Sequence, residues 1–182
     1  LLAEAPGKRN QAEAQNVMTT FLSAYKNIDG VLCQNTTFEG VKHAYDNANI
    51  PMPVVAGDSV MSTIRMLAEM DNYQSIGATN SPGVGADSLH FAVLLLQGYE
   101  LKAEALTPNP LDETLVNTVQ VDPPIAITLD GELPEDILAD YPLLTVLSYA
   151  EAIEMYADME DTYIPDAVMS RQDCIDTWFV AK

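Results

Sequence analysis

The sequence predicts an α/β protein built around an open parallel sheet with flanking helices. Three short apolar runs, residues 30–34, 53–57 and 74–79, each end beside a polar side chain and each lead into a segment of helical spacing. This alternation from residue 1 to 98 is typical of βαβ units, which form parallel sheets with right-handed crossovers. Ligands of such sheets bind outside the carboxyl ends of the strands. We therefore expect the three polar residues, Asn35, Asp58 and Asn80, to converge on one crevice.

Composition sets limits on size and partners. With 182 residues, 48% of them hydrophobic, the chain can bury the core of one full domain or of parts of two small ones. It holds 27 Asp and Glu against 8 Lys and Arg, a net charge of −19, and the acid is concentrated after residue 129. Nucleic acids and anionic membranes bind basic surfaces, so this balance argues against both as partners. No apolar run reaches the roughly 18 residues of a transmembrane helix.

The first half of the chain divides regularly into strands and helices. Residues 1–3 are expected to be the end of a strand, which suggests a piece of a longer protein. Apolar residues recur at helical spacing over 11–25, 38–48 and 61–68, which predicts three amphipathic helices between and before the strands. A fourth helix is predicted over 87–99, where Gly98 is a stop signal.

The second half is less regular. Residues 114–121 alternate well enough to predict a strand, and 125–129 predict another short one. Beyond them, three short helices are expected over 135–141, 149–159 and 170–179, the last with Ser170 as its N-cap. Their position relative to the sheet is left open.

Residues with catalytic or metal-binding chemistry are few. Cys33 lies in an apolar strand and is interpreted as a small buried residue, and a disulfide to Cys174 is left open. His43 and His90 lie in predicted helices without a second ligand at metal-binding spacing. The glycines of residues 83–87 lack the full dinucleotide-loop pattern. With no nucleophile elbow, P-loop or serine–histidine pairing, the sequence predicts no catalytic residue, no metal and no cofactor.

Four segments in order, residues 12–18, 27–35, 53–58 and 77–85, carry a family resemblance. Together they resemble the second half of a type I periplasmic substrate-binding protein, in particular the ribose-binding-like family that serves sugar ABC importers. The resemblance covers residues 8–128. It implies a partial periplasmic binding protein type I fold, in which two α/β lobes close on a sugar.

The resemblance also implies roles for particular side chains. Asn35 would exchange hydrogen bonds with sugar hydroxyls, and Asp58 would accept from a pair of them. Asn80 resembles the polar residue at a hinge crossing, where the family usually has Gln. Arg9 stands where an aromatic residue often stacks on the sugar, and this change suits an anionic or more polar ligand. The alternative roles are helix capping for Asn35 and Asp58 and turn formation for Asn80.

The same resemblance predicts how the chain is divided into domains. Residues 1–128 are expected to form the substrate-binding domain, with the second lobe reaching to about 80 and a crossing segment over 81–128. Residues 129–182 are expected to be an acidic, mainly helical C-terminal extension. The helix over 87–99 would then need a partner, either a missing first lobe or a second copy of the chain.

The function expected from these observations is solute binding without catalysis. The chain would be the periplasmic component of an importer, passing a sugar or sugar-like ligand to an ABC permease in the membrane. An effector-sensing domain of a lactose-repressor-type regulator is the alternative, and a basic helix-turn-helix upstream would distinguish it. A small α/β enzyme using Asp58 or Asp87 is a third hypothesis, although the sequence shows no base beside either residue.

Overall fold

The structure is a computed structural model that describes residues 1–34, 37–80, 82–109, 111–112, 114–121, 125–141, 144–166 and 168–180, apart from the side chain of Asp58. Its centre is a five-stranded sheet in the order β1-β2-β3-β4-β5. The strands are β1 (Gly30–Cys33), β2 (Val54–Asp58), β3 (Ser75–Ala78), β4 (Ile125–Thr128) and β5 (Thr145–Ser148). The predicted α/β class with flanking helices is thereby confirmed, and the sheet, predicted to be parallel, is parallel at all but one of its strand pairs.

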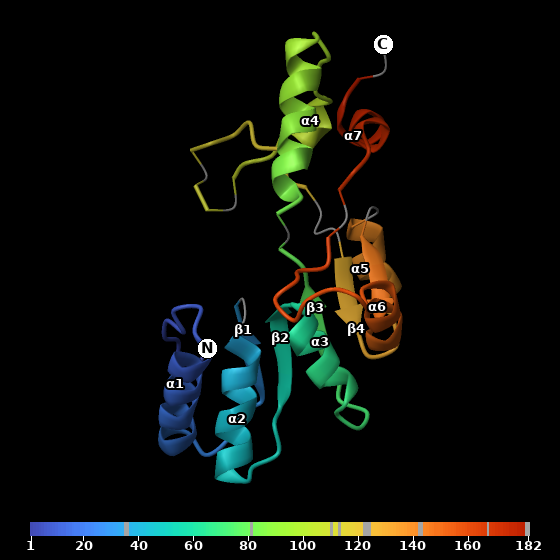
Figure 1. Ribbon diagram of the computed structural model, residues 1–182. Coiled ribbons are helices and arrows are strands. Elements are labelled where there is room, and N and C mark those ends of the chain that lie inside the picture. The colour runs from blue at the N-terminus through green and yellow to red at the C-terminus, as the bar shows by residue number, and fades with distance from the viewer. Residues whose placement is uncertain are drawn as a thin grey trace.

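One step in the sheet is antiparallel. Strands β1, β2 and β3 run parallel, β4 runs antiparallel to β3, and β5 is again parallel to β4. The reversal follows from the path of the chain, which leaves β3 at its carboxyl end, travels away from the sheet, and comes back at that same end (Figure 1). A fully parallel sheet would have required a crossover along the sheet instead.

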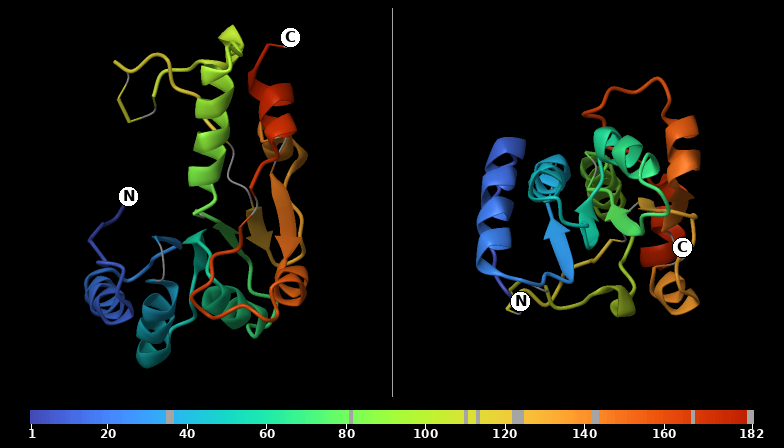
Figure 2. Two further views of the ribbon diagram at one scale, coloured as in Figure 1. Left: turned by 45° about the horizontal axis from the view of Figure 1, so that its top comes forward. Right: turned by 90° about the horizontal axis from the view of Figure 1, so that it is seen from below.

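Four helices cover one face of the sheet or extend that layer beyond β1. They are α1 (Gln11–Ala24), α2 (Phe38–Ala48), α3 (Met61–Ala68) and α6 (Tyr149–Met155). The view from below shows this layer above the strands, with α5 (Glu135–Asp140) on the opposite side near β4 and β5 (Figure 2, right). The main hydrophobic core lies under the layer and includes Phe38, Val55, Ile64 and Ile127.

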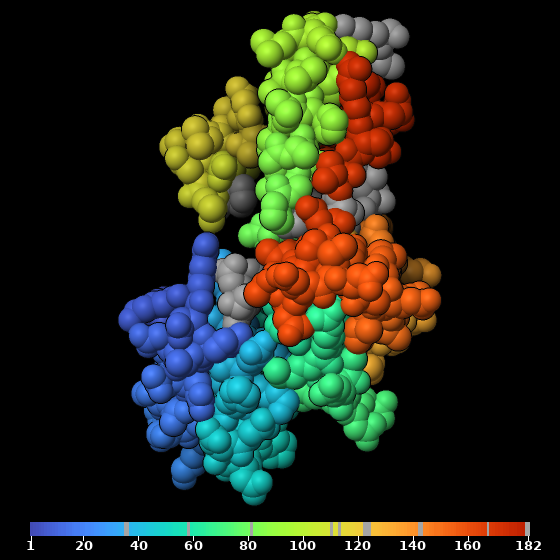
Figure 3. All heavy atoms as spheres, viewed as in Figure 1, coloured from blue at the N-terminus to red at the C-terminus, as the bar shows by residue number. Residues whose placement is uncertain are grey.

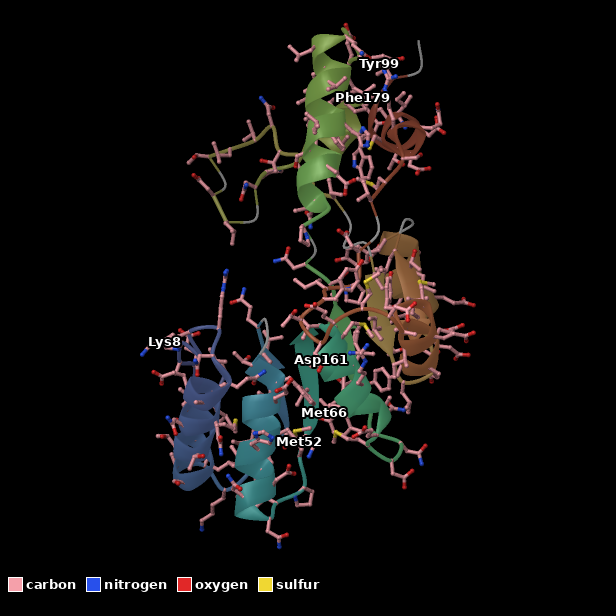
Figure 4. The ribbon with its side chains drawn as sticks, in the orientation of Figure 1. Lys8, Met52, Met66, Tyr99, Asp161 and Phe179 are labelled. Carbon is pink, nitrogen blue, oxygen red and sulfur yellow. The ribbon has the colours of Figure 1, made fainter. Side chains whose placement is uncertain are left out.

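A second, smaller unit stands apart from the sheet. Helix α4 (Val84–Leu96) rises from the end of β3 and packs against α7 (Arg171–Trp178), with the short 3-10 helix η2 (Ala103–Ala105) nearby (Figures 1 and 3). Its own buried cluster consists of Leu94, Cys174, Trp178 and Phe179. The labelled rings of Tyr99 and Phe179 meet there edge to face, with centroids 6.2 Å apart (Figure 4).

Several expected elements differ in the structure. Residues 1–3 do not form a strand, and residues 114–121 form only the isolated bridge of Thr118 to Thr107 in their described part. Both predictions were wrong because neither segment lies beside another strand that could satisfy its backbone groups. Helix α4 begins at Val84, three residues before the predicted start at 87.

The segment after residue 129 joins the body of the protein. It supplies β5, which pairs with β4 over four residue positions, and α6, which packs against α3. The domain boundary expected at 128 therefore coincides with the end of β4 inside the sheet. In contrast, α7 lies in the small unit beside α4.

Candidate functional site

The carboxyl ends of β1, β2 and β3 form one edge of the sheet. Their register places Cys33, Gly57 and Gly77 side by side, so the three strands end within about one residue of each other. Close contact explains the glycines here, because a Cβ on Gly57 would lie 1.8 Å from the Cys33 carbonyl oxygen and one on Gly77 would lie 1.6 Å from Ser59 Oγ. The backbone of this edge is therefore tightly packed across adjacent strands.

The structure describes the predicted site residues to different extents. Asn35 lies outside the described residues, two positions after the end of β1. Asp58 is the last residue of β2 and its backbone pairs with Ala78, but its side chain is not described. Asn80 is exposed just beyond β3. Two of the three predicted positions are thus placed at the same strand edge by the backbone.

Arg9 lies in the turn that precedes α1. The turn needs left-handed backbone at two positions, with φ of 51° at Lys8 and 52° at Arg9. It approaches the same side of the molecule as the strand ends, because a Cβ on Gly7 would lie 3.1 Å from Thr37 Cγ2 at the start of α2. The side chain of Arg9 is exposed.

Hydrogen bonds hold the strand ends in place. The backbone N–H of Thr79 donates to the Ile125 carbonyl at 2.9 Å, and its hydroxyl donates to the same oxygen at 3.3 Å. Thr37 donates from Oγ1 to the Gln34 carbonyl at 2.9 Å. Such a fixed backbone is what a binding edge needs, since ordering it on binding costs affinity.

The segment around residues 161–166 covers part of this edge. The N–H groups of Met61 and Ser62, at the start of α3, donate to the carbonyls of Tyr163 and Asp161, each at 2.9 Å. Arg65 of α3 also pairs with the side chain of Asp161, which is labelled above α3 in Figure 4. The first amides of α3 are thereby already satisfied and do not offer an anion site.

Two carboxylates tie the start of α4 to the segment that leads into α7, and sequence reasoning assigned this role to neither of them. Asp166 accepts from the Gly83 N–H at the start of α4 at 3.0 Å, while its other oxygen, Oδ1, is buried without a hydrogen-bond partner among the described residues. Asp87 accepts from the Met169 N–H at 3.0 Å. Burial raises the pKa of Asp87 above its usual value, and the nearby Asp166 raises it further. No local pattern could have paired residues about 80 positions apart.

A hollow in the surface lies elsewhere among the described residues. It measures 510 Å³ and is bounded by the first part of β2 and β3, including Val54 and Ile76, and by the segment that follows β4, including Asp130 and Glu132. Val54 begins β2, so this hollow sits toward the amino ends of the parallel strands. It is therefore separate from the strand edge where the sequence places ligand-binding residues.

Metal-ligand clusters and the state of the two cysteines bear on the chemistry of the described residues. No cluster of three or more His, Cys, Asp or Glu side chains suited to a metal ion occurs there. Cys33 and Cys174 are both unpaired and buried. Burial raises the pKa of Cys33 to about 11 and also raises that of Cys174, so both thiols stay protonated and unreactive at neutral pH.

Comparison with known proteins adds no family assignment. Neither the protein-family models, nor the curated proteins, nor the solved structures gave a match to this chain. The described helices include none with the length and apolar character that crossing a bilayer requires.

Proposed function

We propose that this chain binds a sugar or sugar-like solute at the carboxyl edge of β1, β2 and β3, as part of an extracytoplasmic solute-binding protein. The observation that carries the proposal is the shared end of three adjacent parallel strands, with Asp58 and Asn80 at the ends of two of them. Ligand sites of open α/β sheets lie at this kind of edge. Dense hydrogen bonding from strand-end amides and carboxylates suits a ligand rich in hydroxyl groups.

The arrangement of the two units supports a hinged binding mode. The chain leaves the sheet after β3, forms α4 and η2 beyond the strand ends, and returns as β4 (Figure 1). A second passage follows α6, where residues 161–166 lead toward α7. Two bodies joined by several crossing segments can close on a ligand held between them. An ABC permease that distinguishes the open from the closed form is the partner this proposal implies.

The proposal is tested by thermal unfolding of the full chain with a panel of D-ribose, D-glucose, D-galactose, D-glucuronate and myo-inositol. A ligand that binds only the folded state raises the melting temperature as its concentration rises. We expect at least one sugar or sugar acid to do so, and we expect Asp58→Ala to abolish the shift by removing the hydroxyl-binding carboxylate.

The matched control is Asp71→Ala. Asp71 is an exposed aspartate in the turn before β3, at the amino end of that strand, and its carboxylate contacts Asn72. The ligand-induced shift should persist in this variant. A flat response across the panel, or equal loss in both variants, would refute binding at the strand edge.

A further inference from the structure

The sheet has one face that no described helix covers over β1, β2 and β3. The helix layer of α2, α3 and α6 lies on the other side (Figure 2, right). On the bare face, Leu32 is 85% exposed, Val54 53% and Ile76 39%. The register aligns Leu32, Ala56 and Ile76 across the three strands. Parallel strands in α/β proteins are covered on both faces, so this apolar row lacks a partner.

The 510 Å³ hollow described above deepens this face at one end. Its floor is apolar, with Val54 and Ile76 from the strands, and Leu133 adds to the wall. Asp130 and Glu132 provide two exposed carboxylates on the same wall, and the described lining residues include no lysine or arginine. The hollow therefore combines an apolar surface with negative charge.

We propose that this hollow and the adjoining row of Leu32, Ala56 and Ile76 dock a basic amphipathic helix of a separate partner protein. A helix is the element that covers the opposite face of the same strands. Its apolar side would bury the exposed row, and lysine or arginine at its margin would meet Asp130 and Glu132. Helix-in-groove docking of this type is a common recognition mode.

Charge decides between a basic helix and a second copy of this chain. The chain has a net charge of −19 and only 8 Lys and Arg. Pairing two copies would therefore bring like charges together beside the acidic wall of the hollow. Charged groups across an interface are normally complementary, and like-charge contact opposes docking. The occupant that fits is therefore cationic, and it is not a copy of this protein.

The test uses a fluorescently labelled synthetic peptide of about 14 residues, or roughly four helical turns. Its leucines lie on one helical face and lysines flank them. Two further peptides serve as probes of mechanism: a scramble of identical composition without an apolar face, and a version with glutamate in place of lysine. Each is titrated into the full chain and followed by fluorescence anisotropy.

We expect the amphipathic basic peptide to bind at least about tenfold more tightly than either of the others, a difference of about 1.4 kcal/mol. Ile76→Asp should weaken its binding by about tenfold or more, and Glu132→Gln by a few-fold, because a rim charge contributes less than the buried floor. The matched controls, Leu111→Asp and Glu154→Gln, alter an exposed leucine and an exposed glutamate elsewhere and should leave binding unchanged.

Three outcomes would overturn the proposal. Equal binding of the basic peptide and its scramble would indicate unspecific attraction to an acidic protein. Unchanged binding by a folded Ile76→Asp variant, or by Leu32→Asp if the first fails to fold, would place the contact elsewhere. A dimer in sedimentation that Leu32→Asp dissociates would identify a second copy as the occupant. Ile76→Asp should keep any sugar-induced rise in melting temperature, so this test is independent of the proposed function.

Discussion

Two aspartates with opposite environments show how single residues link stability to pH. Asp87 is only 6% exposed and accepts one backbone hydrogen bond, from Met169. Burial, together with Asp166 nearby, raises its pKa. Asp173 is exposed in the first turn of α7, and its hydrogen bonds from the side chain and backbone of Ser170 lower its pKa. Relative to the unfolded chain, the fold disfavours the charged form of the Asp87 carboxyl and favours the charged form of the Asp173 carboxyl.

Asp87→Asn should raise the melting temperature at pH 7. The pKa of Asp87 is higher in the folded state than in the unfolded state. Its contribution to folding stability is therefore fully present below the unfolded-state pKa, about 3.9, and is lost as pH rises through the folded-state pKa. Asparagine keeps the carbonyl oxygen that accepts from Met169 and carries no charge. The gain over wild type should shrink toward pH 4 in calorimetric melts.

Asp173→Asn is the control with the opposite sign. The pKa of Asp173 is lower in the folded state than in the unfolded state. Its contribution to folding stability is therefore present at neutral pH and is lost as pH falls through the lowered, folded-state pKa. This variant should melt below wild type at pH 7 and approach it in acid. Shifts of the same sign for both variants would contradict the assigned environments.

At the scale of elements, the packing of α1 on α2 depends on one glycine. A Cβ on Gly40 would lie 2.1 Å from the Gln11 carbonyl oxygen and 2.9 Å from Ala14 Cβ. The Gly40 N–H also donates to Gln11 Oε1 at 2.7 Å. The helices therefore meet at backbone distance, and the close approach requires the absence of a side chain.

Gly40→Ala should lower the free energy of unfolding by roughly 1–3 kcal/mol, the usual cost of an overpacked contact. Gly85→Ala in α4 is the matched substitution, because an added Cβ there meets nothing within 4 Å. It should stabilise the protein by about 0.5–1 kcal/mol, since alanine is the better helix former. Urea unfolding of both variants measures the difference, and a stabilised Gly40→Ala protein would disprove the close helix contact.

At the scale of the whole molecule, the two hydrophobic clusters are separate. The larger one lies between the sheet and its helix layer, and the smaller one lies between α4 and α7. Trp178 is the single tryptophan of the chain, and it belongs to the smaller cluster with Phe91 5.3 Å away between ring centroids. Tryptophan fluorescence therefore reports the small unit alone.

We expect fluorescence to change at lower urea concentration than the main far-UV circular dichroism transition, because the smaller cluster buries less apolar surface. Phe179→Ala should lower the fluorescence midpoint and leave the main dichroism midpoint nearly unchanged. Phe38→Ala, in the larger cluster, should lower the dichroism midpoint. Coincident transitions in all three proteins would show one cooperative unit instead of two.

The sequence by itself determined the elements whose apolar residues follow a clear period. Helix α2 spans Phe38–Ala48 as predicted, and α1, α3 and β1 to β4 lie within about a residue of their predicted bounds. The Ser170 cap of α7 was also predictable, and Ser170 does accept from the Asp173 N–H. These features depend on nearby residues, so local spacing and capping chemistry suffice to specify them.

For the candidate site, the sequence determined which strands end in polar residues, and the backbone places Asp58 and Asn80 at one edge. The tertiary structure alone decided the antiparallel entry of β4, the position of β5 and the bare sheet face. It also decided the hydrogen bonds of Asp87 with Met169 and of Asp166 with Gly83. Each of these depends on partners far away in the chain, and a backbone or carboxyl group acquires its environment only when packing brings those partners together.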